Sequence, residues 1–150
     1  MHMKAVFLAG AFTPTSRARL EGAAANLRYN RYGVVSKWHD EDDRLEGAAK
    51  VMGYSIEDSL ANAIAIRDLY AITGCDIFIL DTFEPSTTGA YHTELGLAIA
   101  TDMRRHIRII QVGPINHAYQ TFIRERYSSW ASLLAVLAEE NKQRRDMGNG

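Results

Sequence analysis

Two acidic residues of this chain occupy helical patterns in which a carboxylate is unexpected. Tyr91, Glu94, Leu95 and Ala98 recur at intervals of three and four residues, so a helix here places Glu94 with core-facing residues. Asp68 lies late in another predicted helix, where a negative charge is poorly matched to the helix dipole. Carboxylates in such positions can act as nucleophiles or exchange protons. The alternative is that each is an ordinary helix residue, solvated or paired with an arginine.

The segment before Glu94 predicts how that residue is positioned. Ile77 to Leu80 form a short apolar run typical of a central parallel strand, and Asp81 ends it. The turn from residue 82 to residue 89 contains Pro85, Ser86, Thr87, Thr88 and Gly89, which are loop and helix-cap residues, so a helix should begin near residue 90. Ligands in open parallel sheets bind beyond the carboxyl ends of the strands. This turn is therefore a candidate site by its position.

The motifs of this segment, taken in order with others along the chain, resemble the nucleoside 2-deoxyribosyltransferase superfamily. That group includes the nucleoside 5'-monophosphate N-glycosidases. The matching motifs are Pro85-Ser86 with Gly89, then Glu94-Leu95-Gly96-Leu97-Ala98, together with Val6-Phe7-Leu8-Ala9-Gly10, Arg67-Asp68-Leu69 and Val112-Gly113-Pro114. The resemblance covers roughly residues 4 to 115.

The resemblance implies a fold, a chemistry and an assembly. The fold is α/β, a Rossmann-like (flavodoxin-like) three-layer sandwich with a mostly parallel sheet of four to five strands. Glu94 would be the nucleophile, with Asp68 facing the same site and Tyr91 helping to keep Glu94 ionised. Members of the family form homodimers or higher homo-oligomers with shared active sites. Asn116 and His117, in the loop after the fourth strand, are candidates for a contact donated to a neighbouring subunit.

The loop after the first predicted strand, Ala5 to Ala9, is a second part of the candidate site. It begins with Gly10, includes Phe12 and leads into a helix that Ser16 or Thr15 can cap. The free amides of a first helical turn, with Arg17 and Arg19, would favour an anion. In the resembled family this loop wraps the sugar and, in the monophosphate glycosidases, the phosphate. An ordinary turn with two solvated arginines is the alternative.

The second predicted strand, Tyr32 to Trp38, ends in a loop that contains His39 and four acids. Trp38 either stacks on a nucleobase or packs in the core. His39 is expected in a solvated loop, because the acids around it lack the spacing of a metal site. We expect no metal and no cofactor, and a full dinucleotide-binding glycine fingerprint is absent.

The remaining elements are predicted from helical periodicity and strand composition. Residues 44–54 have little pattern and could form a lid. Ser55 should cap a helix that runs to Gly74, and strands are expected at residues 106–112 and 124–127. A last helix follows from Ser128 or Ser129, and its tail over residues 140–150 is expected to fray. The whole chain, residues 1–150, is predicted to be a single domain.

Composition excludes several classes of function. Apolar residues make up 47% of the chain and charged residues 23%, and the net charge is −1, so nothing suggests a nucleic-acid polymer as partner. No apolar run approaches the length of a membrane span, and the start does not resemble a signal peptide. A single cysteine, Cys75, allows no internal disulfide. We therefore expect a cytoplasmic protein that acts on a small nucleotide or nucleoside.

The turn before Glu94 decides between the branches of the resembled family. Transferases carry an aspartate about six residues before the nucleophile, which holds a free 5'-hydroxyl and would repel a phosphate dianion. This chain has Thr88 at that spacing and Ser86 nearby, and Phe7 stands where many transferases have a tyrosine. We therefore predict hydrolysis of the N-glycosidic bond of a (deoxy)nucleoside 5'-monophosphate. The alternatives are a nucleoside 2-deoxyribosyltransferase and a non-catalytic nucleotide-binding sensor.

The predicted site can be given as two sets of residues. The catalytic set is Glu94, Asp68 and Tyr91. The substrate-binding set is Gly10, Phe12, Ser16, Arg17, Trp38, His39, Asp81, Ser86, Thr88, Gly89 and Asn116.

Overall fold

A five-stranded sheet forms the centre of the molecule in the computed structural model, which describes residues 2–40, 58–86 and 88–148. The strands are β1 (Ala5–Ala9), β2 (Gly33–Val34), β3 (Ile77–Asp81), β4 (Arg108–Val112) and β5 (Glu125–Tyr127). They lie in the order β2-β1-β3-β4-β5, and each neighbouring pair is parallel. The predicted α/β class and parallel sheet are confirmed.

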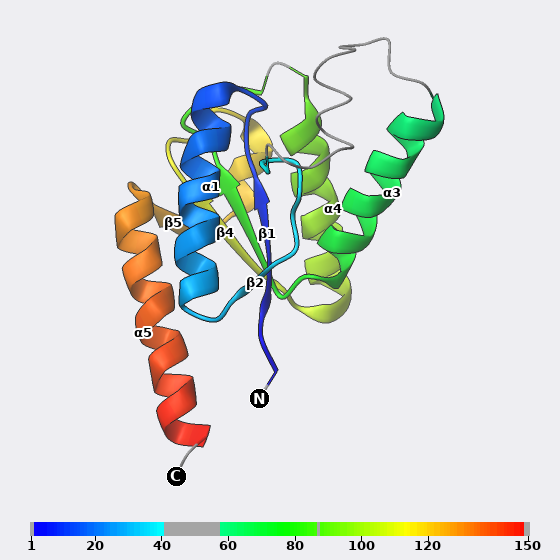
Figure 1. Cartoon of the computed structure of the whole chain (residues 1–150). Coiled ribbons are helices and arrows are strands. Elements are labelled where there is room, and N and C mark those ends of the chain that lie inside the picture. Colours follow the sequence, from blue (N-terminus) through cyan, green and yellow to red (C-terminus); the bar gives the residue numbers. More distant parts are fainter. Residues whose placement is uncertain (1, 41–57, 87, 149–150) are drawn as a thin grey trace.

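Helices cover both faces of this sheet. They are α1 (Pro14–Tyr29), α3 (Asp58–Gly74), α4 (Ala90–Arg105), α5 (Trp130–Gly148) and the short 3-10 helix η2 (Ala118–Phe122). On one face α1 packs with α5, and on the other α3 packs with α4 (Figure 1). The three-layer sandwich predicted from the sequence is therefore present.

The two central strands are the most deeply buried part of the fold. Every residue of β3 is buried, and so are four of the five residues of β1, because helices cover both of their faces. Phe7 of β1 stacks on Phe78 of β3, with ring centroids 5.8 Å apart. The apolar runs that predicted these two strands therefore form part of the hydrophobic core.

The second strand is shorter than the predicted Tyr32–Trp38, because side chains replace its backbone pairing. After Val35, whose amide still bonds to the Val6 carbonyl at 2.9 Å, the next two bonds to β1 come from side chains. The Ser36 hydroxyl accepts from the Leu8 amide at 3.0 Å, and the Trp38 indole donates to the Leu8 carbonyl at 2.6 Å. Both main-chain groups of Leu8 are thus satisfied without a longer strand.

Several predicted boundaries need correction or fall outside the described residues. The N-cap of α1 is Thr13, whose side chain accepts from the Ser16 amide at 3.2 Å, and neither Thr15 nor Ser16 takes that role. β4 begins at Arg108, two residues later than expected. The predicted lid and the Ser55 cap lie outside the described residues. α5 is helical to Gly148, and both the fraying of its tail and the single-domain division stay predictions.

Two further structural properties bear on function. None of the helices in residues 2–40, 58–86 and 88–148 has the length and apolar character needed to cross a membrane. In the same parts of the chain, no three histidine, cysteine or acidic side chains are grouped so that they could hold a metal ion.

Candidate active site

The strand order creates a natural place for a ligand between β1 and β3. The chain leaves β1 toward β2 on one side and returns to β3 on the other, so the connections at the carboxyl ends of these two strands diverge. The loop after β1 and the turn after β3 meet there. They are linked by a hydrogen bond from the Thr13 hydroxyl to the Glu84 carboxylate. The two loops that the sequence predicted as site segments are therefore in contact.

Gly10 allows the two strand ends to come close. A Cβ atom at this position would stand 2.9 Å from Cδ1 of Leu20 and 3.4 Å from Cβ of Asp81. A side chain here would press on the buried Leu20 side chain, which would have to move, whereas its contact with Asp81 would be an ordinary van der Waals contact.

Glu94 lies in the second turn of α4, near the carboxyl edge of the sheet. The helix begins at Ala90, after Gly89 in the left-handed conformation at a φ of 77°. Tyr91, Leu95 and Ala98 are buried, and Glu94 is half-buried with its Oε2 atom shielded from solvent. The predicted placement of this carboxylate beside core residues is confirmed. Its position near the start of a helix also suits a negative charge.

Asp68 lies on α3, the helix that packs beside α4. Its carboxylate is about one fifth exposed and pairs with the neighbouring Arg67, with 3.3 Å between Nε and Oδ1. The two predicted catalytic acids are therefore carried by adjacent helices on the same face of the sheet.

Tyr91 is fully buried, and its hydroxyl bonds to groups other than Glu94. It accepts from the Asn116 amide nitrogen at 3.1 Å, and its one proton is within reach of the Glu84 carbonyl at 3.2 Å and of the Asn116 Oδ1 atom at 3.3 Å. Among the bonds of the described residues, none supports the predicted donation from Tyr91 to Glu94. Tyr91 instead ties the turn before α4 to the loop after β4.

Asn116 makes hydrogen bonds within its own chain, and the contact with a neighbouring subunit stays a prediction. Its amide nitrogen donates to the Thr82 carbonyl at 3.2 Å, and its oxygen accepts from Gln120 at 2.7 Å. Gln120 also accepts from the Asn116 backbone amide at 2.9 Å. Asn116 therefore fixes the loop after β4 against the turn after β3.

The hydroxyls of Ser86 and Thr88, in the turn before α4, already accept hydrogen bonds from backbone amides at the start of that helix. Ser86 accepts from the Gly89 amide at 3.0 Å, and Thr88 accepts from the Ala90 amide at 3.3 Å. As acceptors in these bonds, both hydroxyls still have a proton to donate. Thr87, which the sequence left as a third candidate, lies outside the described residues.

Arg17 is buried, although the sequence left open a solvated arginine. Its Nε donates to the Trp38 carbonyl at 3.3 Å and one terminal nitrogen donates to the Asp40 carbonyl at 3.4 Å. The other terminal nitrogen is buried without a hydrogen bond. The ring of Phe12, which is partly exposed, lies 5.1 Å from the guanidinium carbon. This cation therefore bonds to carbonyl oxygens and to no carboxylate in the described residues.

Trp38 packs in the core, which is one of the two roles predicted for it; the other was stacking on a nucleobase. It is 6% exposed, and the ring of Phe12, which is 38% exposed, lies beside it with ring centroids 6.1 Å apart. Phe12 is therefore the better placed of the two aromatic rings to meet a ligand.

Asp81 is fully engaged by protein donors. Arg19 binds it through two hydrogen bonds of 2.6 and 2.8 Å, the indole of Trp130 donates at 2.8 Å, and the Phe83 amide donates at 3.1 Å. The Asp81 hydrogen bond raises the pKa of Arg19 above its ordinary value. These bonds hold Arg19 against the end of β3, and the substrate contact of Asp81 stays a prediction.

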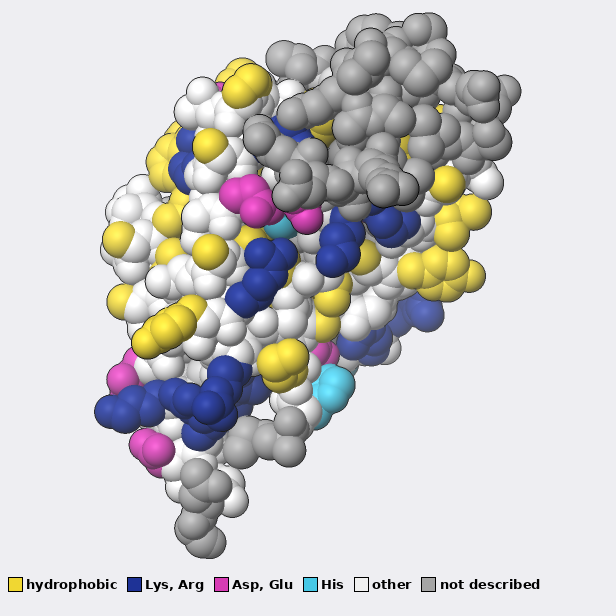
Figure 2. All heavy atoms as spheres, viewed as in Figure 1, with side chains coloured by type: hydrophobic (Ala, Val, Ile, Leu, Met, Phe, Trp, Pro, Cys, Tyr) yellow, Lys and Arg dark blue, Asp and Glu magenta, His cyan; other side chains and the backbone are white. Residues whose placement is uncertain are grey.

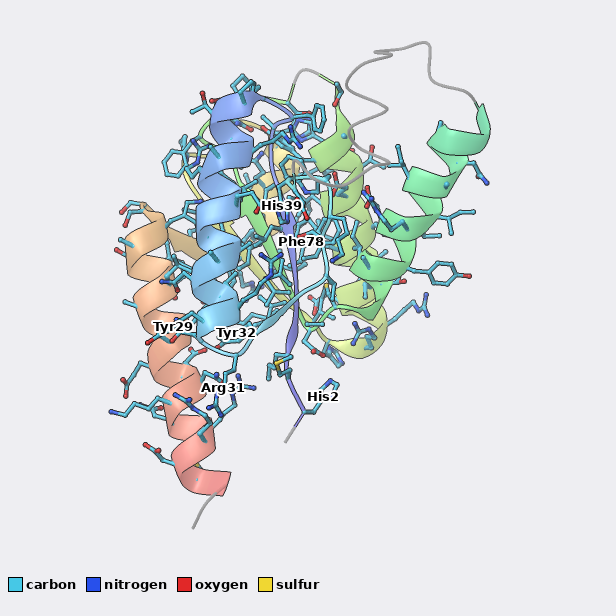
Figure 3. All side chains as sticks on the ribbon, viewed as in Figure 1. His2, Tyr29, Arg31, Tyr32, His39 and Phe78 are labelled. Carbon is cyan, nitrogen blue, oxygen red and sulfur yellow. The ribbon has the colours of Figure 1, made fainter. Side chains whose placement is uncertain are left out.

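His39 is buried, so the prediction of a solvated loop is wrong at this residue. Figure 3 shows His39 in the loop that follows β2. Its Nε2 lies 2.7 Å from the Ser36 hydroxyl and its Nδ1 lies 2.5 Å from the Glu21 carboxylate. Since the Ser36 oxygen accepts from the Leu8 amide, the consistent arrangement has Ser36 donating to Nε2 and Nδ1–H donating to Glu21. Burial lowers the pKa of His39, which favours this neutral form.

Sequence reasoning missed Glu84 and His92. Glu84 joins the two site loops through its carboxylate and holds Tyr91 through its carbonyl, and only its place inside the turn could have suggested it. His92 lies against the ring of His117, with centroids 4.2 Å apart. Burial, then the neighbouring His117, lowers the pKa of His92.

This chain is similar to known proteins in its three-dimensional structure. No family model matches the chain, and no curated protein sequence matches it. The solved CMP N-glycosidase BcmB of Clostridium botulinum is 20% identical, with a TM-score of 0.55 over 89% of this chain and 98% of that chain. A 2-deoxyribosyltransferase of Bacillus psychrosaccharolyticus is 14% identical, with a TM-score of 0.64 over 89% and 95%. The chain therefore shares its fold with a CMP N-glycosidase and a 2-deoxyribosyltransferase, which at this level confirms the resemblance seen in the sequence.

Proposed function

We propose that this protein is an enzyme of the nucleoside 2-deoxyribosyltransferase superfamily that hydrolyses the N-glycosidic bond of a (deoxy)nucleoside 5'-monophosphate. The observation that carries the proposal is the position of Glu94. A half-buried carboxylate stands near the carboxyl edge of β3, on a fold shared with two proteins whose names describe such chemistry. The motif Glu94-Leu95-Gly96-Leu97-Ala98 resembles that of the family, although the turn before it is a little longer than in the glycosidases.

The electrostatics of the surrounding loops support a phosphorylated substrate. Two further acids at this edge of the described residues, Asp81 and Glu84, are already bound by Arg19 and Thr13. Arg17 is a buried cation without a carboxylate partner among the described residues. Ser86 and Thr88 each have a hydroxyl proton to donate. These features suit an anion better than a second carboxylate would.

The proposed reaction proceeds in two steps through Glu94. In the first, the carboxylate attacks the anomeric carbon, the bond to the base breaks, and Asp68 supplies the proton that the departing base takes up. In the second, Asp68 accepts a proton from water, the water oxygen attacks the anomeric carbon, and the ester to Glu94 breaks. The products are the free base and the sugar 5-phosphate. Gly10, Phe12, Ser16 and Gly89 shape the pocket in this proposal.

A chromatographic assay for free base tests the proposal directly. The protein is incubated with nucleosides and their 5'-monophosphates, each with and without a second free base. We expect release from monophosphates alone, without an acceptor, and a loss of at least about a thousand-fold in Glu94→Gln. Glu139→Gln, which removes a carboxylate from α5, should leave the rate unchanged. Ser86→Ala and Thr88→Ala should raise KM for monophosphates.

Other outcomes of this assay select other functions. The fold shared with a 2-deoxyribosyltransferase makes transfer the second candidate, and base exchange that requires an acceptor would establish it. Nucleotide binding without any release, retained in Glu94→Gln, would instead indicate a sensor.

A further inference from the structure

A cavity lies at the edge of the sheet opposite to Glu94. It has a volume of about 440 Å³, and its walls include Lys4 just before β1, Asp76 just before β3 and Arg108 at the start of β4. The Asp76 amide donates to the Ala5 carbonyl at 2.8 Å, and the Arg108 amide donates to the Asp76 carbonyl at 3.0 Å, so these strand ends lie side by side. Because the strands are parallel and five residues long, this amino edge is about 16 Å from the carboxyl edge.

The ends of two helices form the other walls of this cavity. Arg105 and His106 come from the end of α4, and Gln143, Arg144 and Met147 come from the last turns of α5. These helices lie on opposite faces of the sheet (Figure 1), so the cavity crosses the sheet edge from one helical layer to the other. Figure 2 shows a group of Lys and Arg side chains over the same end of α5.

The walls of the cavity carry an excess of positive charge. They contain four cations and two carboxylates, which gives a net charge of +2 with His106 neutral, although the net charge of the whole chain is −1. Of the cations, Arg108 is held between Glu140 and Glu125 at 2.6 and 2.7 Å. The other carboxylate of the walls, Asp76, already accepts a backbone amide through Oδ2 at 2.8 Å.

The three remaining cations, Lys4, Arg105 and Arg144, form no ion pair in the part of the chain that the structure describes. Arg105 donates to two backbone carbonyls at the end of α3, one of them at 3.0 Å. Arg144 donates to the Asn141 side chain at 2.6 Å, and its guanidinium carbon lies 5.6 Å from the centre of the Tyr32 ring. Neutral partners thus fix both guanidinium groups without cancelling their charge, and each group keeps further N–H donors.

A phosphate monoester has the chemistry that these walls fit best. Such a group carries a charge of about −1.5 to −2 at pH 7, which matches the excess of the walls, and guanidinium groups bind phosphate oxygens in pairs. The volume of about 440 Å³ exceeds what a phosphate group alone would fill and is typical of pockets for small molecules. Ile77 and Met147 add apolar wall for the organic part of the ester.

We propose that this cavity binds a small organic phosphate monoester through Lys4, Arg105 and Arg144. The site is separate from the carboxyl edge, and it does not require the proposed hydrolysis. α4 extends from one site to the other, because Glu94 lies in its second turn and Arg105 is its last residue. A ligand bound to Arg105 therefore contacts the helix that carries Glu94.

An NMR titration of the full chain with phenyl phosphate, at constant ionic strength, tests the site. We expect saturable shifts of the amides of Lys4, Asp76 and Arg105, with a dissociation constant of about 1 mM or below. Lys4→Gln and Arg105→Gln should each weaken binding about tenfold. Lys4 is exposed, so its variant should fold, and thermal unfolding checks both. Arg104→Gln is the matched control, because Arg104 is exposed on the same turn of α4 but outside the walls, and it should change the affinity less than about twofold.

Three results would overturn the inference. They are titration without saturation up to about 10 mM, shifts confined to the residues around Glu94, and a loss of affinity in Arg104→Gln equal to that in Arg105→Gln. Inorganic phosphate, titrated in the same way, should bind about tenfold more weakly, because it leaves the apolar wall uncovered. Equal binding of inorganic phosphate would overturn the assignment to an organic ester.

The test also separates this inference from the proposed function. Glu94→Gln should bind phenyl phosphate at the amino edge as the wild-type protein does. Binding there by a protein that releases no base from any nucleotide would refute the proposed function alone. Base release by a protein that shows no binding at the amino edge would refute this inference alone.

Discussion

At the scale of single residues, the acids at the carboxyl edge of the sheet differ in what surrounds them. Asp81 receives four hydrogen bonds and Glu84 is bound by Thr13, so both serve the structure. Glu94 shares the buried side of a helix with apolar neighbours and has one oxygen shielded from solvent. Side chains of the same chemistry therefore lie in different surroundings at this edge of the sheet.

Replacing Asp81 should lower stability. In Asp81→Asn, Arg19 loses a bidentate carboxylate partner and one donor loses a charged acceptor, so the free energy of unfolding should fall by about 2 to 3 kcal/mol. We place this fall in stability below the cost of breaking a fully buried ion pair, because the Arg19 side chain is a quarter exposed to solvent. Urea denaturation measures it, with Glu139→Gln as a surface control that should change stability by less than about 0.5 kcal/mol. An equal effect of both substitutions would contradict the structural role of Asp81.

Stability should also depend on pH through His39. Burial lowers its pKa in the folded protein below the ordinary value of 6.5, so the unfolded chain binds the proton more tightly. The stabilising contribution is fully present above about pH 6.5 and is lost as the pH falls below it, with a slope of at most about 1.4 kcal/mol per pH unit.

Denaturation at several pH values between 5 and 8 measures this slope. The slope should be smaller in His39→Gln and unchanged in His2→Gln, since His2 is exposed. His92, whose pKa is also lowered, should contribute with the same sign. A slope unaltered by His39→Gln would show that the buried network does not respond to protonation.

At the scale of elements, the site depends on loops that are packed against one another. The turn after β4 touches the turn after β3, and Gly113 stands at this contact with a φ of 113°. A Cβ atom there would lie 2.8 Å from the Thr82 hydroxyl and 3.1 Å from the Phe83 amide. The two turns can pack this closely only because residue 113 has no side chain.

Gly113→Ala should therefore destabilise the protein, by about 1 to 3 kcal/mol, through backbone strain and the close contact. Gly22→Ala is its matched control. Gly22 lies on an exposed part of α1, where a Cβ atom meets nothing within 4 Å, so alanine should stabilise the helix by about 0.5 to 1 kcal/mol. Thermal unfolding of the two variants should show shifts of opposite sign, and a neutral Gly113→Ala would mean that the turns can separate without cost.

At the scale of the whole molecule, the strand order brings the parts of the site together. Because β1 lies between β2 and β3, the loop after β1 and the turn after β3 open at the same edge. α3 and α4 cover one face and carry both Asp68 and Glu94.

The sequence alone determined the elements whose signals are local. The apolar runs of β1 and β3, the cap residues of the turn and the helical spacing around Glu94 depend on neighbours within a few positions, so they can be recognised without a structure. The family-like motifs predicted the fold for the same reason. The bounds of β2 could not be predicted, because they depend on where Ser36 and Trp38 meet Leu8.

Only the tertiary structure decided which polar residues are engaged and which are available. Asp81 is bound by Arg19, 62 positions away, and by Trp130, 49 positions away. His39 and Arg17 are buried by elements that adjoin them only after folding. The roles of Glu84 and Asn116 depend on contacts between separate loops. The pairing of such groups is a property of three-dimensional proximity, which a pattern of neighbouring residues does not contain.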